Sequence, residues 1–431
     1  MLEHTDPNLL LVLKVLPAIA VILAASWGCG RLALLVGQPR VLGEMVAGVL
    51  LGPTMFGALF PGVQQALFPA EVKPVLYVLS TIGLTLFMFL VGAGLDHGSK
   101  EKGENGKAAA LAVSGIVPSL VLGGGVGVLL HSQLSVPGVS MFQFALFIGG
   151  ALSITAFPML ARILYERNLQ NSRLGRLTLY AASIDDAAAW CFLAVLSALH
   201  ATSGIGSALV TIGLATAFVL LMLFGVRPLL RPLGRQVERS GKFGFDQMYV
   251  VVGVALLAGF CTDYIGIYSV FGGFIAGLAM PRNKVFREAV QAKMMDVVCV
   301  LLLPMFFTLS GLNTQLNGLA SLALLGPFAL ILAAGFVGKY FGCAVSMRAV
   351  GFGWRQSFAV GGLMNARGLM ILIFINIGLA QQMISQEVFS MLVLVAVITT
   401  AAAVPLYRWA LPPRFENEVA FPSPDREKVL V

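Results

Sequence analysis

Apolar residues occur in long runs along this chain, and short polar segments separate the runs. About thirteen of the runs are long enough, or nearly so, to cross a bilayer as helices of roughly 20 residues. They predict helices at residues 9–30, 41–59, 74–95, 108–130, 141–164, 176–199, 204–226, 245–262, 265–281, 296–311, 318–346, 356–380 and 384–409. The pattern therefore predicts an all-α, polytopic membrane protein.

The composition agrees with a membrane class. Of the 431 residues, 58% are hydrophobic and 11% are charged, whereas soluble domains carry about 25% charged residues. The mean hydropathy is +0.90. The five cysteines stand singly in apolar segments, a spacing that favours neither a disulfide framework nor a zinc site. We expect no cofactor.

Lysine and arginine are distributed unevenly between the two sides of the predicted helices. With the N-terminus placed outside, 24 of the 28 basic residues fall in or beside the inside segments, and only Lys73 falls outside. Cytoplasmic loops carry this excess in membrane proteins, so the pattern predicts an outside N-terminus and a cytoplasmic C-terminus. The net charge of +8 is then a topology signal, and a nucleic-acid partner is not expected.

The odd number of predicted helices suggests two repeats joined by a linker. Six helices over 9–199 form the first repeat, 204–226 is the linker, and 245–409 holds the second repeat; 410–431 is a short cytoplasmic tail. Two inverted repeats of this kind are a common plan among transporters.

The fifth predicted helix of each repeat is interrupted. In the first repeat the residues 151–158 include Ser153 and Thr155 and end at Pro158, which removes a backbone donor and clashes with the carbonyl of Ile154. In the second repeat the residues 361–368 include Asn365 and Arg367. Polar breaks at matching positions of two repeats indicate a binding site, where freed carbonyls can bind ions.

Two adjacent acids, Asp185 and Asp186, lie near the middle of the sixth predicted helix. A carboxylate at the centre of a membrane helix costs on the order of 2.5–3.5 kcal/mol to insert, which favours a functional role. Neighbouring helical residues point about 100° apart, so one acid can face the ion path while the other meets a partner. Both carboxylates and the Thr155 hydroxyl form a predicted site for a monovalent cation, with Ser153 beside it, because hard cations prefer oxygen ligands.

Two basic residues within predicted helices are candidate charge partners. Lys339 could pair with one of the acids and exchange a proton, because a buried lysine has an easily shifted pKa. Alternatively, it could extend to the cytoplasmic surface. Arg367 could neutralise the helix ends at the break or take part in ion handling. Asn365 lies beside it.

Five segments, in this order, resemble the monovalent cation:proton antiporters, the branch that includes bacterial sodium/proton antiporters, Kef potassium-efflux systems and plant cation/proton exchangers. The segments are Val41-Leu42-Gly43-Glu44 with Gly52-Pro53; Leu86 to Gly92; Ala151 to Pro158 and on to Arg162; Ser183-Ile184-Asp185-Asp186; and Met364-Asn365-Ala366-Arg367-Gly368. The resemblance covers residues 9–409.

The resemblance implies that Asp186 binds the cation and the proton alternately. It also implies that Asp185 pairs with Lys339, as in electrogenic members, and that the two broken helices cross beside the acids. Residues 108–199 and 318–409 would form a moving core, and residues 9–95 and 245–311 a scaffold that forms a homodimer. The protein would lie in the plasma membrane, which is the inner membrane of a bacterium, in contact with lipid.

The resulting hypothesis is a secondary transporter, not an enzyme, that exchanges Na⁺ or K⁺ for protons by alternating access and moves net charge. No GxxxxGK[ST] motif is present, so the proton gradient would drive it. Two alternatives are an organic-anion symporter of similar architecture and an intramembrane aspartyl protease. The protease fits poorly, because such chemistry usually needs two facing carboxylates from different helices.

Overall fold

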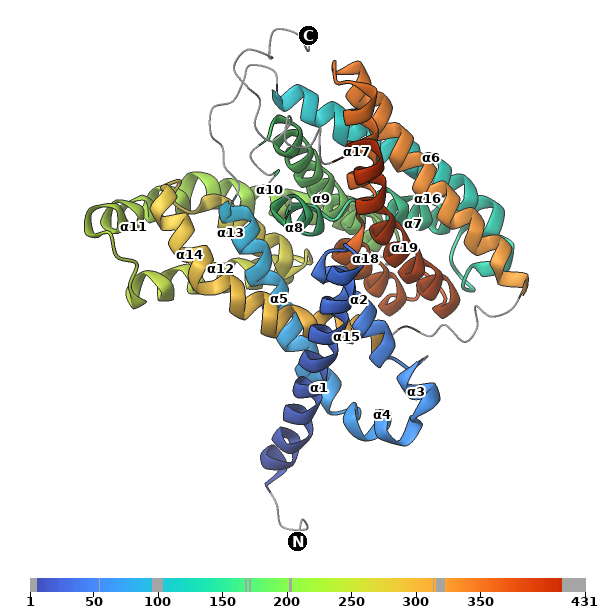
Figure 1. Cartoon of the computed structure of the whole chain (residues 1–431), viewed down its shortest axis with the longest axis horizontal. Helices are drawn as coiled ribbons and strands as arrows, with labels where there is room; N and C mark the ends of the chain where they lie inside the picture. Colours follow the sequence, from blue (N-terminus) through green and yellow to red (C-terminus); the bar gives the residue numbers. More distant parts are fainter. Residues whose placement is uncertain are drawn as a thin grey trace. The chain divides into compact units, whose positions relative to one another are not determined.

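A computed structural model shows how these segments fold. It describes residues 6–53, 55–94, 104–166, 169, 172–200, 204–312, 314 and 322–412. Every regular element among these residues is a helix, and no strand occurs in them (Figure 1). The all-α prediction is therefore confirmed. The predicted tail lies outside the described residues from 413 onward.

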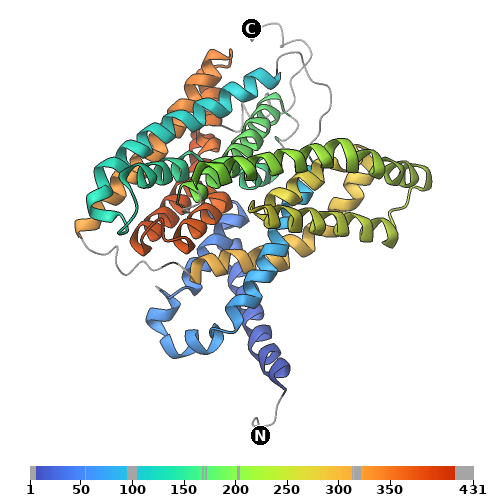
Figure 2. The same ribbon diagram turned by 180° about the vertical axis from the view of Figure 1, so that it is seen from behind.

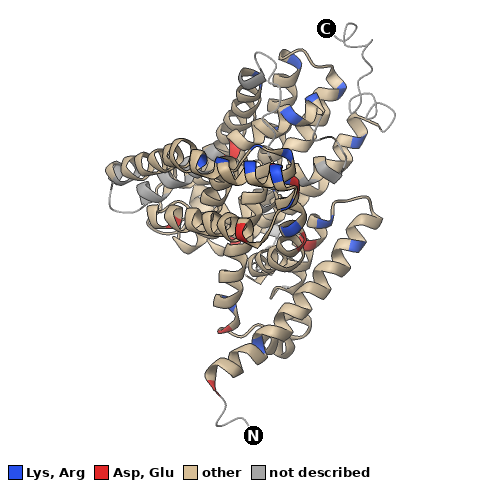
Figure 3. Ribbon diagram, turned by 90° about the vertical axis from the view of Figure 1, so that its left-hand side faces the viewer, with Lys and Arg blue, Asp and Glu red and all other residues tan. Residues whose placement is uncertain are grey.

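The helices have the length and composition of membrane spans. Nine helical segments in the described ranges are long and apolar enough to cross a membrane. Charged residues are sparse along the ribbon (Figure 3). Each predicted span overlaps one helix or a run of successive helices, while the total number that cross the membrane stays a prediction.

The chain divides into two compact units. Unit 1 consists of residues 1–29, 44–98 and 203–313, and unit 2 of residues 30–43, 99–202 and 314–431. The segments expected to form the moving core fall in unit 2, and those expected to form the scaffold fall in unit 1 except for residues 30–43; the division into scaffold and moving core stays a prediction. The inverted repeats themselves stay a prediction.

Unit 1 is built around one central helix. Its elements are most of α1 (Pro7–Leu35) and α2 (Arg40–Leu51), then α3 (Phe56–Leu59), α4 (Pro61–Leu67), α5 (Val72–Gly94), α10 (Gly204–Leu220), the π-helix η1 (Leu221–Val226), α11 (Arg227–Ser240), α12 (Phe245–Ile265), α13 (Ser269–Ala279), α14 (Lys284–Val297), the π-helix η2 (Val298–Leu302) and α15 (Leu303–Leu312). Helix α5 packs against α12, α13, α14, η2 and α15, so it forms the centre of this unit.

Unit 2 contains the two interrupted helices. Its elements are α6 (Glu104–Leu134), α7 (Met141–Ser153), α8 (Phe157–Glu166), α9 (Arg173–His200), α16 (Leu322–Ala349), α17 (Trp354–Met364), α18 (Gly368–Ala380) and α19 (Gln386–Ala410). Helix α6 packs along α16 and α7 (Figure 2), and α19 packs on α17 and α18. The acid-bearing helix α9 contacts α6, α7 and α8.

Both breaks are present, and the structure defines their limits. The first comprises residues 154–156, and Pro158 lies in the first turn of α8, where a missing N–H leaves no helical bond unmade. The second comprises residues 365–367. Gly361 and Gly362 lie inside α17 instead of at the break, and a side chain at either position would press on α16 or α19.

Glycines let α5 and α13 approach closely in unit 1. A methyl group on Gly273 would overlap the carbonyl oxygen of Thr85, and one on Gly277 would overlap that of Phe89. Small residues at such contacts allow two helix backbones to pack together in a membrane. The α5–α13 contact therefore tolerates no added side chain at these positions.

We predict that Gly277→Ala lowers the thermal unfolding midpoint of the purified protein, because overpacking costs about 1–3 kcal/mol. Gly253→Ala in α12 is the matched control, because a methyl group there meets nothing within 4 Å. Helix propensity alone would favour alanine at both positions by up to about 1 kcal/mol. Equal midpoints for the two variants would contradict the close packing.

Candidate functional site

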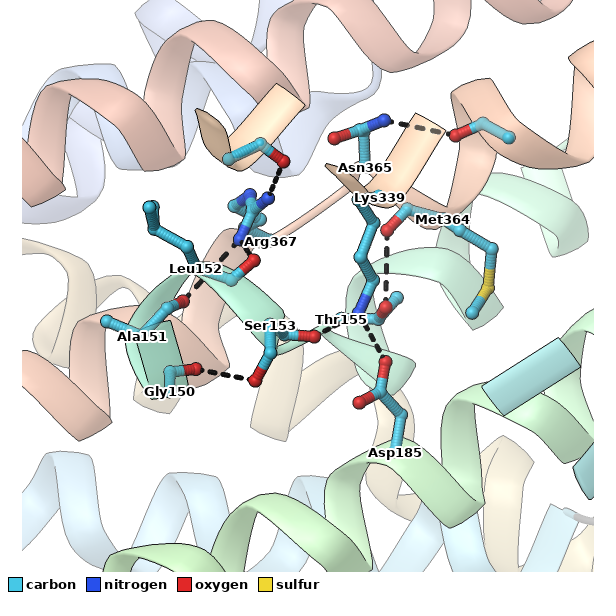
Figure 4. Close-up of polar contacts among 12 residues, drawn as sticks. Gly150, Ala151, Leu152, Ser153, Thr155, Asp185, Lys339, Met364, Asn365 and Arg367 are labelled. Carbon is cyan, nitrogen blue, oxygen red and sulfur yellow. Dashed lines mark hydrogen bonds and ion pairs between the residues drawn. The ribbon is translucent and has the colours of Figure 1, made fainter. Parts of the chain in front are cut away.

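The two breaks in unit 2 meet directly. The backbone N–H of Ala156 donates to the carbonyl oxygen of Ala366 over 3.0 Å. The Thr155 hydroxyl donates to the carbonyl oxygen of Met364 over 3.2 Å (Figure 4). Each break thus satisfies part of the other's freed backbone, which water cannot do inside a membrane. The two interrupted helices are joined where both lose their helical hydrogen bonds.

The neutral side chains that could supply oxygen ligands, Ser153, Thr155 and Asn365, lie in or beside these breaks and are buried. Ser153 ends α7, and its hydroxyl donates to the carbonyl of Gly150 over 2.8 Å. The side-chain amide of Asn365 donates to the carbonyl of Gly361 over 3.1 Å, and its Oδ1 atom has no hydrogen-bond partner among the described residues. The hydroxyls of Ser153 and Thr155 act as donors in these bonds, so their lone pairs remain available to a cation.

The acid pair divides as the helical geometry predicts. Asp185 and Asp186 are 1% and 3% exposed. Asp185 Oδ2 accepts a hydrogen bond from Lys339 Nζ over 2.6 Å (Figure 4). Lys339 also donates to the carbonyl oxygen of Ser153 at the end of α7. The lysine is fully buried, so the pair implied by the resemblance is formed and the surface-seeking alternative for Lys339 is wrong.

Asp186 has a different environment. Neither of its carboxylate oxygens has a hydrogen-bond partner in the described part of the chain. The backbone N–H of Phe157, the first residue of α8, faces this carboxylate without reaching the geometry of a hydrogen bond. The N-terminal end of a helix carries a partial positive charge that favours an anion. Of the two acids, Asp186 is therefore the one that faces a helix N-terminus and lacks a hydrogen-bonded partner among the described residues.

Arg367 holds the C-terminal end of α7. Its guanidinium group is fully buried and donates to the carbonyl oxygens of Leu152 and Gly335 and, over 3.5 Å, to that of Ala151. The last carbonyls of a helix have no helical partner and carry a partial negative charge. These contacts agree with the helix-end role considered for Arg367, since no carboxylate of the pair is hydrogen-bonded to it in the described residues.

Several residues of the site were not found from the sequence. Gly335 supplies a carbonyl to Arg367. A methyl group at Gly115 of α6 would lie 3.0 Å from Cys343 Sγ of α16, so this glycine lets α6 lie close to α16 beside Lys339. Side chains at Gly338 or Gly342 would clash with α6. The sequence does contain a signal for these contacts: glycines recur at intervals of three or four residues along α16, a pattern that predicts a close contact with another helix.

Thr400 of α19 is the other residue that was missed. Its hydroxyl oxygen accepts hydrogen bonds from the backbone N–H groups of Arg367 and Gly368, over 3.2 and 3.1 Å. A threonine in an apolar helix ordinarily bonds to its own helix, so the sequence carried no signal for this contact.

The residues 19–409 match the family model for the transmembrane sodium/hydrogen exchanger. This chain belongs to the sodium/hydrogen exchanger family. Because members of this family are transporters, the prediction that the chain is not an enzyme is confirmed, and the protease alternative is wrong.

Three curated relatives illustrate the range of this exchanger family. The Na(+)/H(+) antiporter NhaS4 of Synechocystis is 40% identical, over 93% of this chain and 97% of its own length. Cation/H(+) antiporter 19 of Arabidopsis thaliana is 36% identical, and the K(+)/H(+) antiporter 1 of Saccharomyces cerevisiae is 30% identical. This chain spans about half the length of the plant and yeast relatives, 46% and 44%.

A solved structure supports the exchanger fold. The sodium proton antiporter MjNhaP1 of Methanocaldococcus jannaschii superposes with a TM-score of 0.69 over 95% of this chain and 99% of its own. The two sequences are 14% identical, so the likeness concerns the fold alone.

We predict that Asp185→Asn and Lys339→Gln each lower the thermal unfolding midpoint, because a buried charge without its partner costs about 3–5 kcal/mol. The double variant should recover much of the loss, since no charge is then left unpaired. A double-mutant cycle on unfolding midpoints measures the coupling. Losses that simply add in the double variant would contradict an interacting pair.

Proposed function

We propose that this exchanger carries Na⁺ or K⁺ in one direction and protons in the other, at Asp186. The observation that carries the proposal is the environment of this carboxylate. It is buried, it lacks a hydrogen-bond partner in the described residues, and it faces the N-terminus of α8 beside the joined breaks. Membership of the sodium/hydrogen exchanger family supports the same activity.

Competition for one carboxylate explains how the two ions are coupled. A carboxylate neutralised by a proton has no charge left for a cation, and a bound cation removes the attraction for the proton. An empty, charged Asp186 would be costly to carry through an apolar core, so the core would move with either ion bound. Alternating access then exchanges one ion for the other without a channel open to both sides.

The neighbouring groups have distinct proposed roles. The hydroxyl oxygens of Thr155 and Ser153 and the Oδ1 atom of Asn365 supply neutral oxygen ligands around the carboxylates. Arg367 keeps the end of α7 in place and is not itself a ligand. The oxygen ligand set suits Na⁺ and K⁺ alike, and the curated relatives are named for sodium, potassium or cation exchange.

We also propose that the exchange is electrogenic. A cation that engages both Asp185 and Asp186 would displace Lys339 from its 2.6 Å contact, and the freed lysine would release its proton. One proton from Asp186 and one from Lys339 then leave for each monovalent cation that enters. The cycle moves one net charge, so the membrane potential would contribute to the driving force.

The membrane setting completes the proposal. The asymmetry of the basic residues supports an outside N-terminus and a cytoplasmic C-terminus in the plasma membrane, the inner membrane of a bacterium. We propose a homodimer surrounded by lipid, with residues 9–95 and 245–311 as scaffold and dimerisation part, and 108–199 with 318–409 as the moving core. The support is the family resemblance of the sequence.

We predict that proteoliposomes containing the purified protein and a trapped pH dye release protons when Na⁺ or K⁺ is added outside acid-loaded vesicles. Asp186→Asn should abolish this release, because the amide carries neither the charge nor the proton. Asp246→Asn, the same change at an exposed residue of α12, is the control and should exchange normally. If neither ion nor Li⁺ moves protons in wild-type vesicles between pH 6 and 9, cation/proton exchange is refuted.

A separate prediction concerns charge. Wild-type proteoliposomes adsorbed on a supported electrode should give a transient current after a cation jump. Lys339→Gln should lose the current more than it loses dye-detected exchange, because only one proton would then leave per cation. A wild-type protein that exchanges protons without any current would contradict electrogenic transport.

A further inference from the structure

The second break begins a helix that has no cap of its own. Arg367 is the N-cap residue of α18, and its side chain makes no capping hydrogen bond because it extends toward α7 and α16. Gly368 follows with a φ of +39°, in the left-handed region that favours glycine. The N–H groups at this turn therefore need an acceptor from elsewhere in the protein.

Thr400 of α19 supplies that acceptor. Its fully buried hydroxyl oxygen accepts both N–H groups, from Arg367 over 3.2 Å and from Gly368 over 3.1 Å. The neighbouring Thr399 is equally buried but bonds only within α19 among the described residues, to the carbonyls of Val395 and Ala396. Of these two adjacent threonines, only Thr400 connects α19 to the break.

The contacts of Thr400 lead in two short steps to the ion site. Fixing the backbone at Arg367 fixes the adjacent carbonyl of Ala366, which accepts the N–H of Ala156 in the first break. Ala156 immediately precedes Phe157, whose N–H faces the Asp186 carboxylate. The position of α8's N-terminus next to Asp186 therefore depends on the position of the second break.

We propose that Thr400 is a positioning residue for cation binding. Its hydroxyl caps α18 from a different helix and holds the second break where it sets the geometry around Asp186. The inference rests on the proposed exchange at Asp186, and it assigns to α19 a role in apparent cation affinity. Thr400 itself does not contact the ion.

The test compares Thr400→Val, Thr400→Ser and Thr399→Val in proteoliposomes. Valine keeps the shape of threonine and removes the hydroxyl, and no water replaces it in an apolar core. We expect Thr400→Val to raise the apparent KM for the cation about tenfold, the scale of effect when buried donors lose their acceptor. The apparent KM of Thr400→Ser and of Thr399→Val should stay within about twofold of wild type, because both variants keep a hydroxyl group at position 400.

Three results would overturn the proposal. They are an unchanged KM in Thr400→Val, a loss of maximal rate alone, and an equal rise of KM in Thr400→Ser. If Thr400→Val cannot be purified, Thr400→Ala against Thr400→Ser makes the same comparison.

Hydrogen exchange of a peptide covering residues 365–370 provides a readout that does not require transport. Its amides should exchange faster in Thr400→Val than in Thr399→Val, and equal rates would overturn the cap. Wild-type vesicles without any cation exchange would contradict the proposed function, and the amide measurement would still decide whether Thr400 caps the break.

Discussion

The requirement that every buried backbone group find a partner governs this site. The break between α7 and α8 at residues 154–156 and the break between α17 and α18 at residues 365–367 both free N–H and C=O groups. Lipid and packed side chains exclude water from such groups inside a membrane. The structure answers with three kinds of partner. The breaks bond to each other, Arg367 and Lys339 donate to the carbonyls at the end of α7, and Thr400 accepts the N–H groups at the start of α18.

This requirement also places the charges. Lys339 reaches both Ser153 and Asp185 from α16, which packs closely against α6: a side chain at Gly342 would overlap the carbonyl oxygen of Ser114 there. Once Asp185 is paired, Asp186 is the acid of the pair without a hydrogen-bonding partner in the described residues. A single helix with two adjacent acids thus presents one carboxylate paired with a lysine and one without such a partner, which is the asymmetry that the proposed competition between proton and cation needs.

The sequence predicted the breaks, the acid pair and the partner lysine because each violates the apolar pattern around it. Asp185 and Lys339 are costly in a membrane helix and so stand out. It did not predict that Gly361 and Gly362 serve helix packing, since a glycine in a membrane helix can mark either a break or a close contact with another helix. It missed Thr400 because its contact joins residues 32 and 33 positions apart, and nothing local distinguishes it from Thr399.

The carbonyl end of α7 links the two buried cations of the site. Arg367 binds the carbonyls of Leu152 and Ala151, and Lys339 binds that of the next residue, Ser153. A cation that displaced Lys339 from Asp185 would still leave it at the Ser153 carbonyl, so the lysine would not be stranded in an apolar core. These carbonyls end the half-helix α7, which leads into the first break. The backbone groups that bind Lys339 and Arg367 are therefore the same groups that set the position of that break. Coupling between ion binding and movement of the core could therefore be local, through contacts already present at the site.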